Sequence, residues 1–279
     1  NNIAIDLAGE IGDSLIIATS YTSAANAYLK IGNYVRALEY SFASLRIYEK
    51  LKLEQRYVGC YNNIAIIYKQ QNDHEKALIY YQMALDLAKK YDNIKSIGEA
   101  NNNIGIIYLE RKDYKTSEDY YLKALKNFEE TDYRLGYLTV LGNLGELYLI
   151  TGNYELAFNN FFEAAEGFKN MENLDFYSTN LGSIASVYYE TDNYKDAIKS
   201  ALESYNVACS IDLLSQQNLV AKLLSDIYFE MNDFYNAYNY LNIYQQTSDS
   251  LYNIEKTKEI ENIKTAYEVE KQEIEILRL

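Results

Sequence analysis

Residues 25–37 read Ala-Asn-Ala-Tyr-Leu-Lys-Ile-Gly-Asn-Tyr-Val-Arg-Ala, and residues 145–157 read Gly-Glu-Leu-Tyr-Leu-Ile-Thr-Gly-Asn-Tyr-Glu-Leu-Ala. Both stretches begin with a small residue and carry a tyrosine three positions later. A Gly-Asn-Tyr turn sequence follows, and an alanine closes each stretch. A pattern that returns so exactly at distant points of a chain predicts a repeated structural unit.

The same pattern recurs every 40 residues along most of the chain. Its first tyrosine is Tyr28, Tyr68, Tyr108, Tyr148, Tyr188 and Tyr228. The small residue three positions earlier is Ala25, Ala65, Gly105, Gly145, Ala185 and Ser225. The turn-forming residue is Asn33, Asp73, Asp113, Asn153, Asn193 and Asp233, and a second small residue follows at Ala37, Ala77, Ser117, Ala157, Ala197 and Ala237. We expect the tyrosines and the small residues to be buried between helices.

Each repeat reads as a helix A, a tight turn and a helix B. The Asn or Asp of the turn can cap the second helix, and the small residues allow the two helices to approach closely. The 279 residues include no proline and only 12 glycines, which favours an all-α chain because both residues interrupt helices. We expect helices at about 14–34 and 35–53, with the pair returning every 40 residues. Each pair buries its apolar face only against its neighbours, so the pattern predicts a solenoid.

A 40-residue helical period also suits armadillo or HEAT repeats. The small-residue, tyrosine and Gly-Asn-Tyr segments resemble the tetratricopeptide repeat (TPR) signature. Asn63-Ile64-Ala65, Asn103-Ile104-Gly105 and Asn143-Leu144-Gly145 are similar to the longer TPR variety of kinesin light chains and bacterial peptide-sensing regulators. The resemblance implies an all-α, right-handed α-α superhelix.

The pattern divides the chain into three parts. Residues 4–13 match a helix B two periods later, so we expect residues 1–13 to be helix B of a truncated leading repeat. Residues 14–248 hold six repeats, and residues 249–279 form a C-terminal capping or linker helix.

The C-terminal helix is expected to begin at Asp249 or Ser250, either of which can serve as an N-cap. Its first half should dock on repeat six through Leu251 and Ile254. Its second half, with Ile274 and Leu277, should project and pair weakly with another copy, giving a monomer or a weak homodimer. The tail also resembles the junction of Bacteroidetes-type signalling proteins, in which TPRs precede a sensor kinase or a DNA-binding output domain.

The charge of the chain is uneven. Residues 1–140 carry a net charge of −1 and residues 141–279 carry −13, which gives −14 in all. Nucleic acid is therefore an unexpected ligand, since phosphate binding needs a basic face.

The residues that carry chemistry are scarce. One histidine, His74, and two distant cysteines, Cys60 and Cys209, leave no catalytic triad and no metal-ligand spacing. We expect no enzymatic activity, no cofactor and no metal. No apolar run is long enough to span a membrane, so we expect a soluble segment, either periplasmic or cytoplasmic.

The TPR resemblance implies a ligand groove on helix A, at positions 9, 6 and 2 before the first tyrosine and 1 or 2 after it. From these positions we select as candidate peptide-binding residues Asn26, Leu29, Lys30, Asn62, Ile66, Lys69, Asn102, Ile106, Leu109, Glu146, Leu149, Tyr189, Glu190, Asp226 and Phe229. The same offsets also give Thr19, Thr22, Gly59, Gln70, Glu99, Glu110, Thr139, Gly142, Ile150, Thr179, Gly182, Ser186, Leu219, Lys222 and Glu230.

The candidate groove residues suit a peptide ligand. Amides of Asn26, Asn62 and Asn102 can pair with a peptide backbone, and the apolar members can supply pockets. Lysines stand at the start of the groove and carboxylates at its end. We therefore expect the acidic part of a ligand at repeats one and two and its basic part at repeats four to six.

A second set of asparagines lies beside the small-residue positions. Asn63, Asn103 and Asn143 fall one position from the groove face, and we expect them to join adjacent helices by side-chain hydrogen bonds because buried amides need partners.

Together these observations predict a protein- or peptide-binding module in the sensory or regulatory region of a bacterial signalling protein. The alternative is a free-standing structural scaffold for a protein complex. The two alternatives differ in whether a membrane helix or an output domain follows Leu279.

Overall fold

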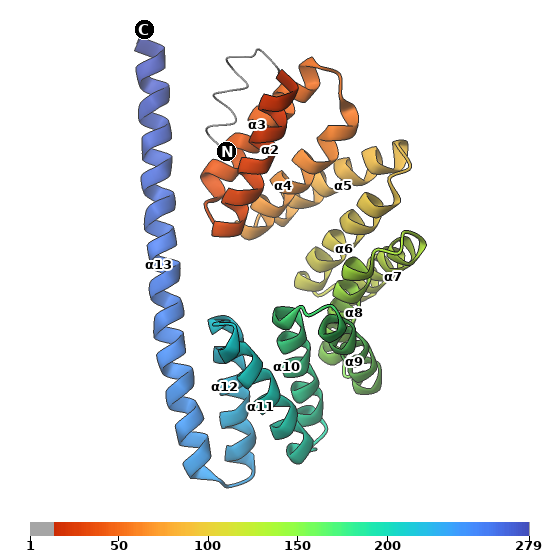
Figure 1. Ribbon diagram of the computed structural model, residues 1–279, viewed down its shortest axis with the longest axis vertical. Helices are drawn as coiled ribbons and strands as arrows, with labels where there is room; N and C mark the ends of the chain where they lie inside the picture. The colour runs from red at the N-terminus through yellow and green to blue at the C-terminus, as the bar shows by residue number, and fades with distance from the viewer. Residues whose placement is uncertain (1–13, 279) are drawn as a thin grey trace. The chain divides into compact units, whose positions relative to one another are not determined.

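The computed structural model describes the backbone of residues 14–278 and the side chains of residues 14–268. The expected leading helix at residues 1–13 lies outside the described residues. The described part of the chain contains helices and no strand (Figure 1). In chain order the elements are α2 (Ser14–Ile31), α3 (Tyr34–Lys50), η1 (Glu54–Arg56), α4 (Tyr57–Gln70), α5 (His74–Lys90), α6 (Ile94–Glu110), α7 (Tyr114–Glu130), α8 (Arg134–Ile150), α9 (Tyr154–Asn170), α10 (Leu174–Glu190), α11 (Tyr194–Ser210), α12 (Leu214–Glu230) and α13 (Phe234–Arg278).

The starts of the helices follow the 40-residue period. Helix B begins at Tyr34, His74, Tyr114, Tyr154, Tyr194 and Phe234, one residue after the turn-forming Asn or Asp. Several of these turn residues cap the helix as expected. The side chain of Asn33 accepts a hydrogen bond from the Arg36 backbone N–H at 3.1 Å, and that of Asp73 accepts one from the Lys76 N–H at 3.1 Å.

The turns themselves follow a period of 20 residues. Each described turn holds one residue in the left-handed backbone region, namely Gly32, Lys52, Asn72, Asp92, Lys112, Asp132, Gly152, Glu172, Asp192, Asp212 and Asn232. At the Gly152 turn, the backbone N–H of Asn153 donates to the carbonyl of Tyr148 at 2.8 Å, which closes the end of α8.

Small residues lie where helices A and B meet. Both predicted sets are buried throughout, from Ala25 and Ala37 in the first pair to Ser225 and Ala237 in the last. At Gly145 the reason is explicit, because a Cβ there would lie 2.6 Å from the ring of Phe161. Glycine therefore makes room for the phenylalanine of the facing helix.

The signature tyrosines are only half-buried, so the expectation that they lie fully in the core is wrong. The rings of Tyr28, Tyr68, Tyr108 and Tyr228 stack on a second tyrosine from helix B instead. Tyr28 and Tyr40 have ring centroids 5.5 Å apart, and Tyr108 and Tyr120 are 5.7 Å apart. In repeat four the hydroxyl of Tyr148 donates to Glu118 at 2.6 Å, and burial together with this bond raises the tyrosine pKa to about 12. A polar hydroxyl held at the edge of the core explains why these rings stop short of full burial.

The described chain falls into two compact units. The first takes in the described residues up to Ile107 together with those from Glu255 onward, and the second is Tyr108–Ile254. In the first unit Leu45, Tyr48 and Ile64 contribute to the core. In the second, Phe161, Phe168 and Ile184 do so, and α10 packs on α8, α9, α11 and α12.

Helix α13 begins at Phe234 and continues without a break through the expected cap at 249 and 250, so a separate C-terminal helix is not present. Ser250 lies inside α13, where its hydroxyl donates to the carbonyl of Gln246 at 3.0 Å. Ile254 is 46% exposed, and its expected docking on repeat six is wrong, whereas Leu251 is half-buried. The preceding helix, α12, has only 17 residues, so α13 outruns it at about Leu251.

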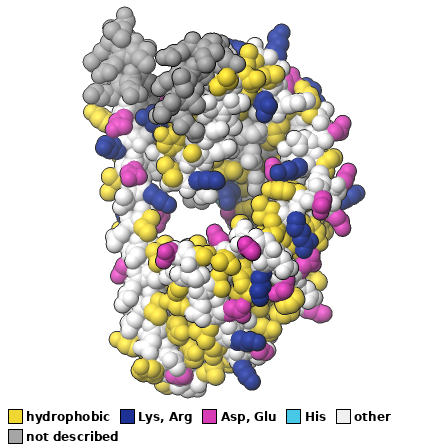
Figure 2. Space-filling model, viewed as in Figure 1, with side chains coloured by type: hydrophobic (Ala, Val, Ile, Leu, Met, Phe, Trp, Pro, Cys, Tyr) yellow, Lys and Arg dark blue, Asp and Glu magenta, His cyan; other side chains and the backbone are white. Residues whose placement is uncertain are grey.

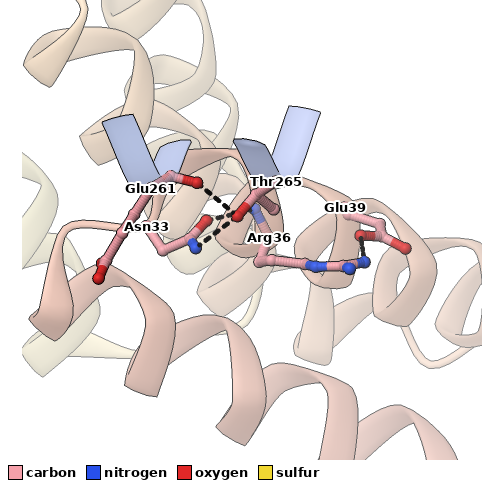
Figure 3. A network of polar contacts seen from close by, with 5 residues as sticks. All are labelled: Asn33, Arg36, Glu39, Glu261 and Thr265. Atoms are coloured by element: carbon pink, nitrogen blue, oxygen red, sulfur yellow. Dashed lines mark hydrogen bonds and ion pairs between the residues drawn. The ribbon is translucent and has the colours of Figure 1, made fainter. Parts of the chain in front are cut away.

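Beyond that point, α13 contacts the turn between α2 and α3 within the first unit (Figure 3). The Asn262 amide nitrogen donates to the Gly32 carbonyl at 3.0 Å, and the Asn33 amide nitrogen donates to the Thr265 hydroxyl at 3.3 Å. Asn262 and Thr265 are the half-buried residues of the segment 252–268, whose other side chains are exposed. The expected projecting residues Ile274 and Leu277 lie outside the described side chains.

Candidate functional site

Among the described residues, a hollow lies on the helix A side of the repeats in each unit. The hollow of the first unit has a volume of about 240 Å³ and includes Asn62 from the candidate set. The hollow of the second unit has a volume of about 300 Å³ and includes Glu146 and Leu149. Other positions at the same offsets line them as well, namely Thr22, Gly59 and Glu99 in the first and Thr139, Gly142 and Thr179 in the second.

The remaining candidate residues lie outside both hollows. Leu29, Ile66, Lys69, Asn102, Ile106, Leu109, Tyr189 and Asp226 are half-buried, and Asn26, Lys30, Glu190 and Phe229 are exposed. The exposed fraction of Phe229 is 61%, and its ring meets that of Phe234 edge-on at 5.7 Å. The residues selected by their offsets on helix A therefore contribute to each of the two hollows. They do not form one continuous lining.

Asparagines join successive repeats in the first unit. The Asn63 amide nitrogen donates to the Asn26 amide oxygen at 2.7 Å, and the Asn103 nitrogen donates to the Asn62 oxygen at 3.0 Å. The prediction of hydrogen bonds between adjacent helices is confirmed for Asn63 and Asn103. The oxygens of Asn26 and Asn62 thus serve the repeat stack, and these two groove candidates offer a ligand their amide nitrogens.

Polar side chains stand at the rim of the first hollow. Arg56 and Gln55 of its rim are exposed, and Glu99 is half-buried. Burial raises the pKa of Glu99, and Lys95, whose amine lies 3.9 Å from the carboxylate, opposes that rise. Arg56 and Gln55 precede helix α4, so the offsets from the tyrosine could not identify them.

The second hollow combines an aromatic floor with a polar rim. Leu138, Phe161 and Phe168 of the floor are buried, and the ring of Phe168 stacks on that of Phe176 at 4.7 Å. Thr139, Glu146 and Ser183 stand around it. The floor was missed because Phe161 and Phe168 come from helix B of the repeat and Phe176 from the start of the next helix A.

Glu146 stands at the rim of this hollow. The Glu146 side chain is exposed, yet the protein around its carboxylate displaces part of the water there, which raises its pKa, and the negative charge of Glu110 raises it further. Glu146 makes no ion pair with any described residue. A nearby cation would therefore be favoured electrostatically.

The acidic residues of the last repeats are partly compensated. The amine of Lys222 contacts the Asp226 carboxylate at 2.6 Å, one helical turn away on α12. Burial raises the pKa of Tyr189, with Asp226, Glu230 and Glu190 adding to that rise. On the face shown in Figure 2, Lys and Arg side chains lie among Asp and Glu side chains.

Among the described residues, no three His, Cys, Asp or Glu side chains gather where they could hold a metal ion. Over the same part of the chain, no helix combines the length and apolar character needed to cross a bilayer. Cys60 and Cys209 are free cysteines.

The chain is similar in fold to several solved structures. The apo form of RapI matches with a TM-score of 0.71 and 17% identity, covering 90% of each chain. A Rap protein complexed with Competence and Sporulation Factor matches at 0.66 and 21%, covering 88% of this chain and 66% of that one. A signal transduction ATPase of the STAND class with a tetratricopeptide repeat sensor, from Pyrococcus horikoshii, matches at 0.68 and 21%, covering 89% and 39%.

No curated protein matches the chain at a significant level. The sequence profile of the Tetratricopeptide repeat family matches residues 16–90 and 96–170, more than half of the chain. These residues include the buried small positions from Ala25 to Ala157 and the capped turns at Asn33 and Asp73. The chain therefore belongs to the tetratricopeptide repeat family, whose fold supports a protein-interaction module.

Proposed function

We propose that the helix A side of the repeats binds an extended peptide or a peptide-like segment of a protein, and that the chain serves as the sensory or regulatory region of a bacterial signalling protein. The observation that carries this proposal is the hollow between α8 and α10. It joins a floor of buried aromatic side chains to a rim of hydroxyl, amide and carboxylate groups. Apolar pockets with a few polar groups are typical of peptide recognition.

The similar structures support the same proposal. One of them is a Rap protein complexed with Competence and Sporulation Factor, and another carries a tetratricopeptide repeat sensor in a signal transduction ATPase. The first is a protein of this fold with a bound factor, and the second uses this fold as a sensor in signal transduction.

A peptide array tests the proposal. Labelled chain is incubated with immobilised heptapeptides of varied sequence, and the wild type is compared with Gly142→Leu, which places a side chain in the hollow. We expect selective binding by the wild type and its loss in Gly142→Leu. Glu166→Gln, on the exposed surface of α9, serves as a control that should retain binding. Absence of selective binding by the wild type would reject peptide recognition and favour a scaffold that contacts only folded proteins.

A further inference from the structure

Three features of the hollow between α8 and α10 restrict what it can bind. The first is the floor, where Phe161 and Phe168 are at most 3% exposed and Phe168 stacks on the more exposed Phe176. Phe176, which is 39% exposed, is the ring of this floor that still meets water, and covering it with a bulky apolar side chain recovers free energy by excluding that water.

The second feature is an acceptor inside the hollow. Asn180 is 4% exposed, and its amide nitrogen donates to the Phe176 carbonyl at 2.8 Å, which fixes the orientation of the amide. Its oxygen accepts no hydrogen bond from a described residue, and a Cβ placed on Gly142 would lie 3.3 Å from it. The missing side chain at Gly142 thus leaves the Asn180 oxygen open to the hollow, where it can accept a hydrogen bond from a donor such as a peptide N–H.

The third feature is the charge at the rim. Glu146 makes no ion pair among the described residues, and the carboxylate of Glu110 lies close enough to disfavour its charge. A ligand cation would relieve both effects, whereas a ligand carboxylate would strengthen them.

We propose that this hollow binds a peptide segment in which a lysine or arginine adjoins a bulky apolar residue. The apolar side chain covers the Phe168–Phe176 floor, the cation lies beside Glu146, and a backbone N–H of the segment donates to the Asn180 oxygen. This proposal rests on the proposed function, because it names the chemical class of the ligand at the same site.

The test uses an array of acetylated heptapeptides with a Gly/Ser frame, in which two adjacent central positions carry every pair of amino acids. We expect pairs of Lys or Arg with Phe, Leu, Met or Tyr to bind best, and pairs containing Asp or Glu to bind least. The affinity of the basic pairs should fall as the salt concentration rises, because screening weakens the attraction to Glu146.

Three variants separate the contribution of the Glu146 charge from that of the hollow itself. Glu146→Gln should weaken the basic peptides about three- to tenfold, as expected for one charge-assisted contact, and leave uncharged apolar peptides unchanged. Gly142→Leu should remove both kinds of binding. Glu166→Gln makes the same carboxylate-to-amide change outside the hollow. It should leave the binding of basic peptides and of uncharged apolar peptides unaltered. Circular dichroism of each variant verifies that the helices are intact.

The outcomes distinguish this inference from the proposed function. If peptides bind and Gly142→Leu abolishes the binding, but basic pairs have no advantage or Glu146→Gln has no effect, the inference is wrong and peptide recognition stands. If no peptide binds the wild type, both proposals are wrong.

Discussion

At the scale of single residues, the turns show how little glycine this fold requires. Nine of the described left-handed positions are occupied by Lys, Asn, Asp or Glu, and only two by glycine. An L-residue in this region costs about 1–2 kcal/mol relative to the right-handed region, and the fold accepts that cost at every turn that lacks glycine.

Two glycines that have room for a Cβ atom test whether the left-handed backbone at the turns carries this cost. Gly152 has φ +76° and Gly59 lies in helix α4, and neither has an atom within 4 Å of an added Cβ. Gly152→Ala should lower the free energy of unfolding by about 1 kcal/mol because alanine is strained there. Gly59→Ala should raise it by about 0.5 kcal/mol because alanine favours the helix. Urea denaturation midpoints that move in the same direction for both variants would contradict the assignment.

The raised pKa of Glu146 predicts that the effect of this residue on stability depends on pH. The folded state takes up a proton at this carboxyl before the unfolded chain does, so ionisation of Glu146 destabilises the fold above its raised pKa. This destabilisation fades as pH falls through that pKa. Glu146→Gln should therefore melt at a higher temperature than the wild type at pH 7, with the difference shrinking by pH 4. Thermal melts at the two pH values measure this, and Glu166→Gln should show no such convergence.

At the scale of helices and turns, the residues that recur at fixed spacing were predictable. The expected pair at about 14–34 and 35–53 is observed as Ser14–Ile31 and Tyr34–Lys50. Asn33 and Asp73 cap their helices because the same short side chain follows the same sharp turn. Local hydrogen bonding determines these features, so a local pattern reveals them.

Features that depend on neighbouring helices were harder to predict. Phe161 and Phe168 belong to helix B, and only the packed structure shows that they form the floor of a hollow lined by helix A residues. Ser250 has a side chain suited to capping, yet it bonds back to Gln246 inside α13. No glycine or proline near it stops the helix, so the composition allowed either outcome.

The asparagine bond between repeats can be measured as a coupling energy. Asn63→Ala and Asn26→Ala each remove the 2.7 Å bond, and we expect a double-mutant cycle to give a coupling of about 1 kcal/mol. Denaturation of the two single variants and the double variant provides the values. Pairing Asn63→Ala with the exposed change Asn159→Ala on α9 should be additive within about 0.5 kcal/mol. A cycle of Asn26 with Asn63 that is equally additive would mean that the bond does not stabilise the stack.

At the scale of the molecule, the contact of α13 with the first turn can be tested without disturbing the repeats. A double variant of Asn262→Ala and Thr265→Val removes the hydrogen bonds to Gly32 and Asn33, of which Figure 3 draws the one between Asn33 and Thr265. We expect faster amide hydrogen exchange in residues 255–268 and a nearly unchanged melting temperature, since partly exposed bonds contribute about 1 kcal/mol each. Lys264→Ala, exposed on the same helix, is the control. Exchange that stays as slow in the double variant as in the control would show that these bonds do not hold the segment.

The bond between Asn33 and Thr265 joins residues 232 positions apart, whereas the packing of α10 on α8, α9, α11 and α12 joins neighbours along the chain. Closing a loop of that length in a flexible chain costs about 1.5 kcal/mol more than closing one of 40 residues. Two hydrogen bonds of about 1 kcal/mol each hardly exceed that cost together with the cost of ordering the side chains. The contact should therefore form after the intervening repeats have folded and be among the first to open. A spectroscopic probe attached at position 265 would then report the destabilisation of repeats that Thr265 does not contact.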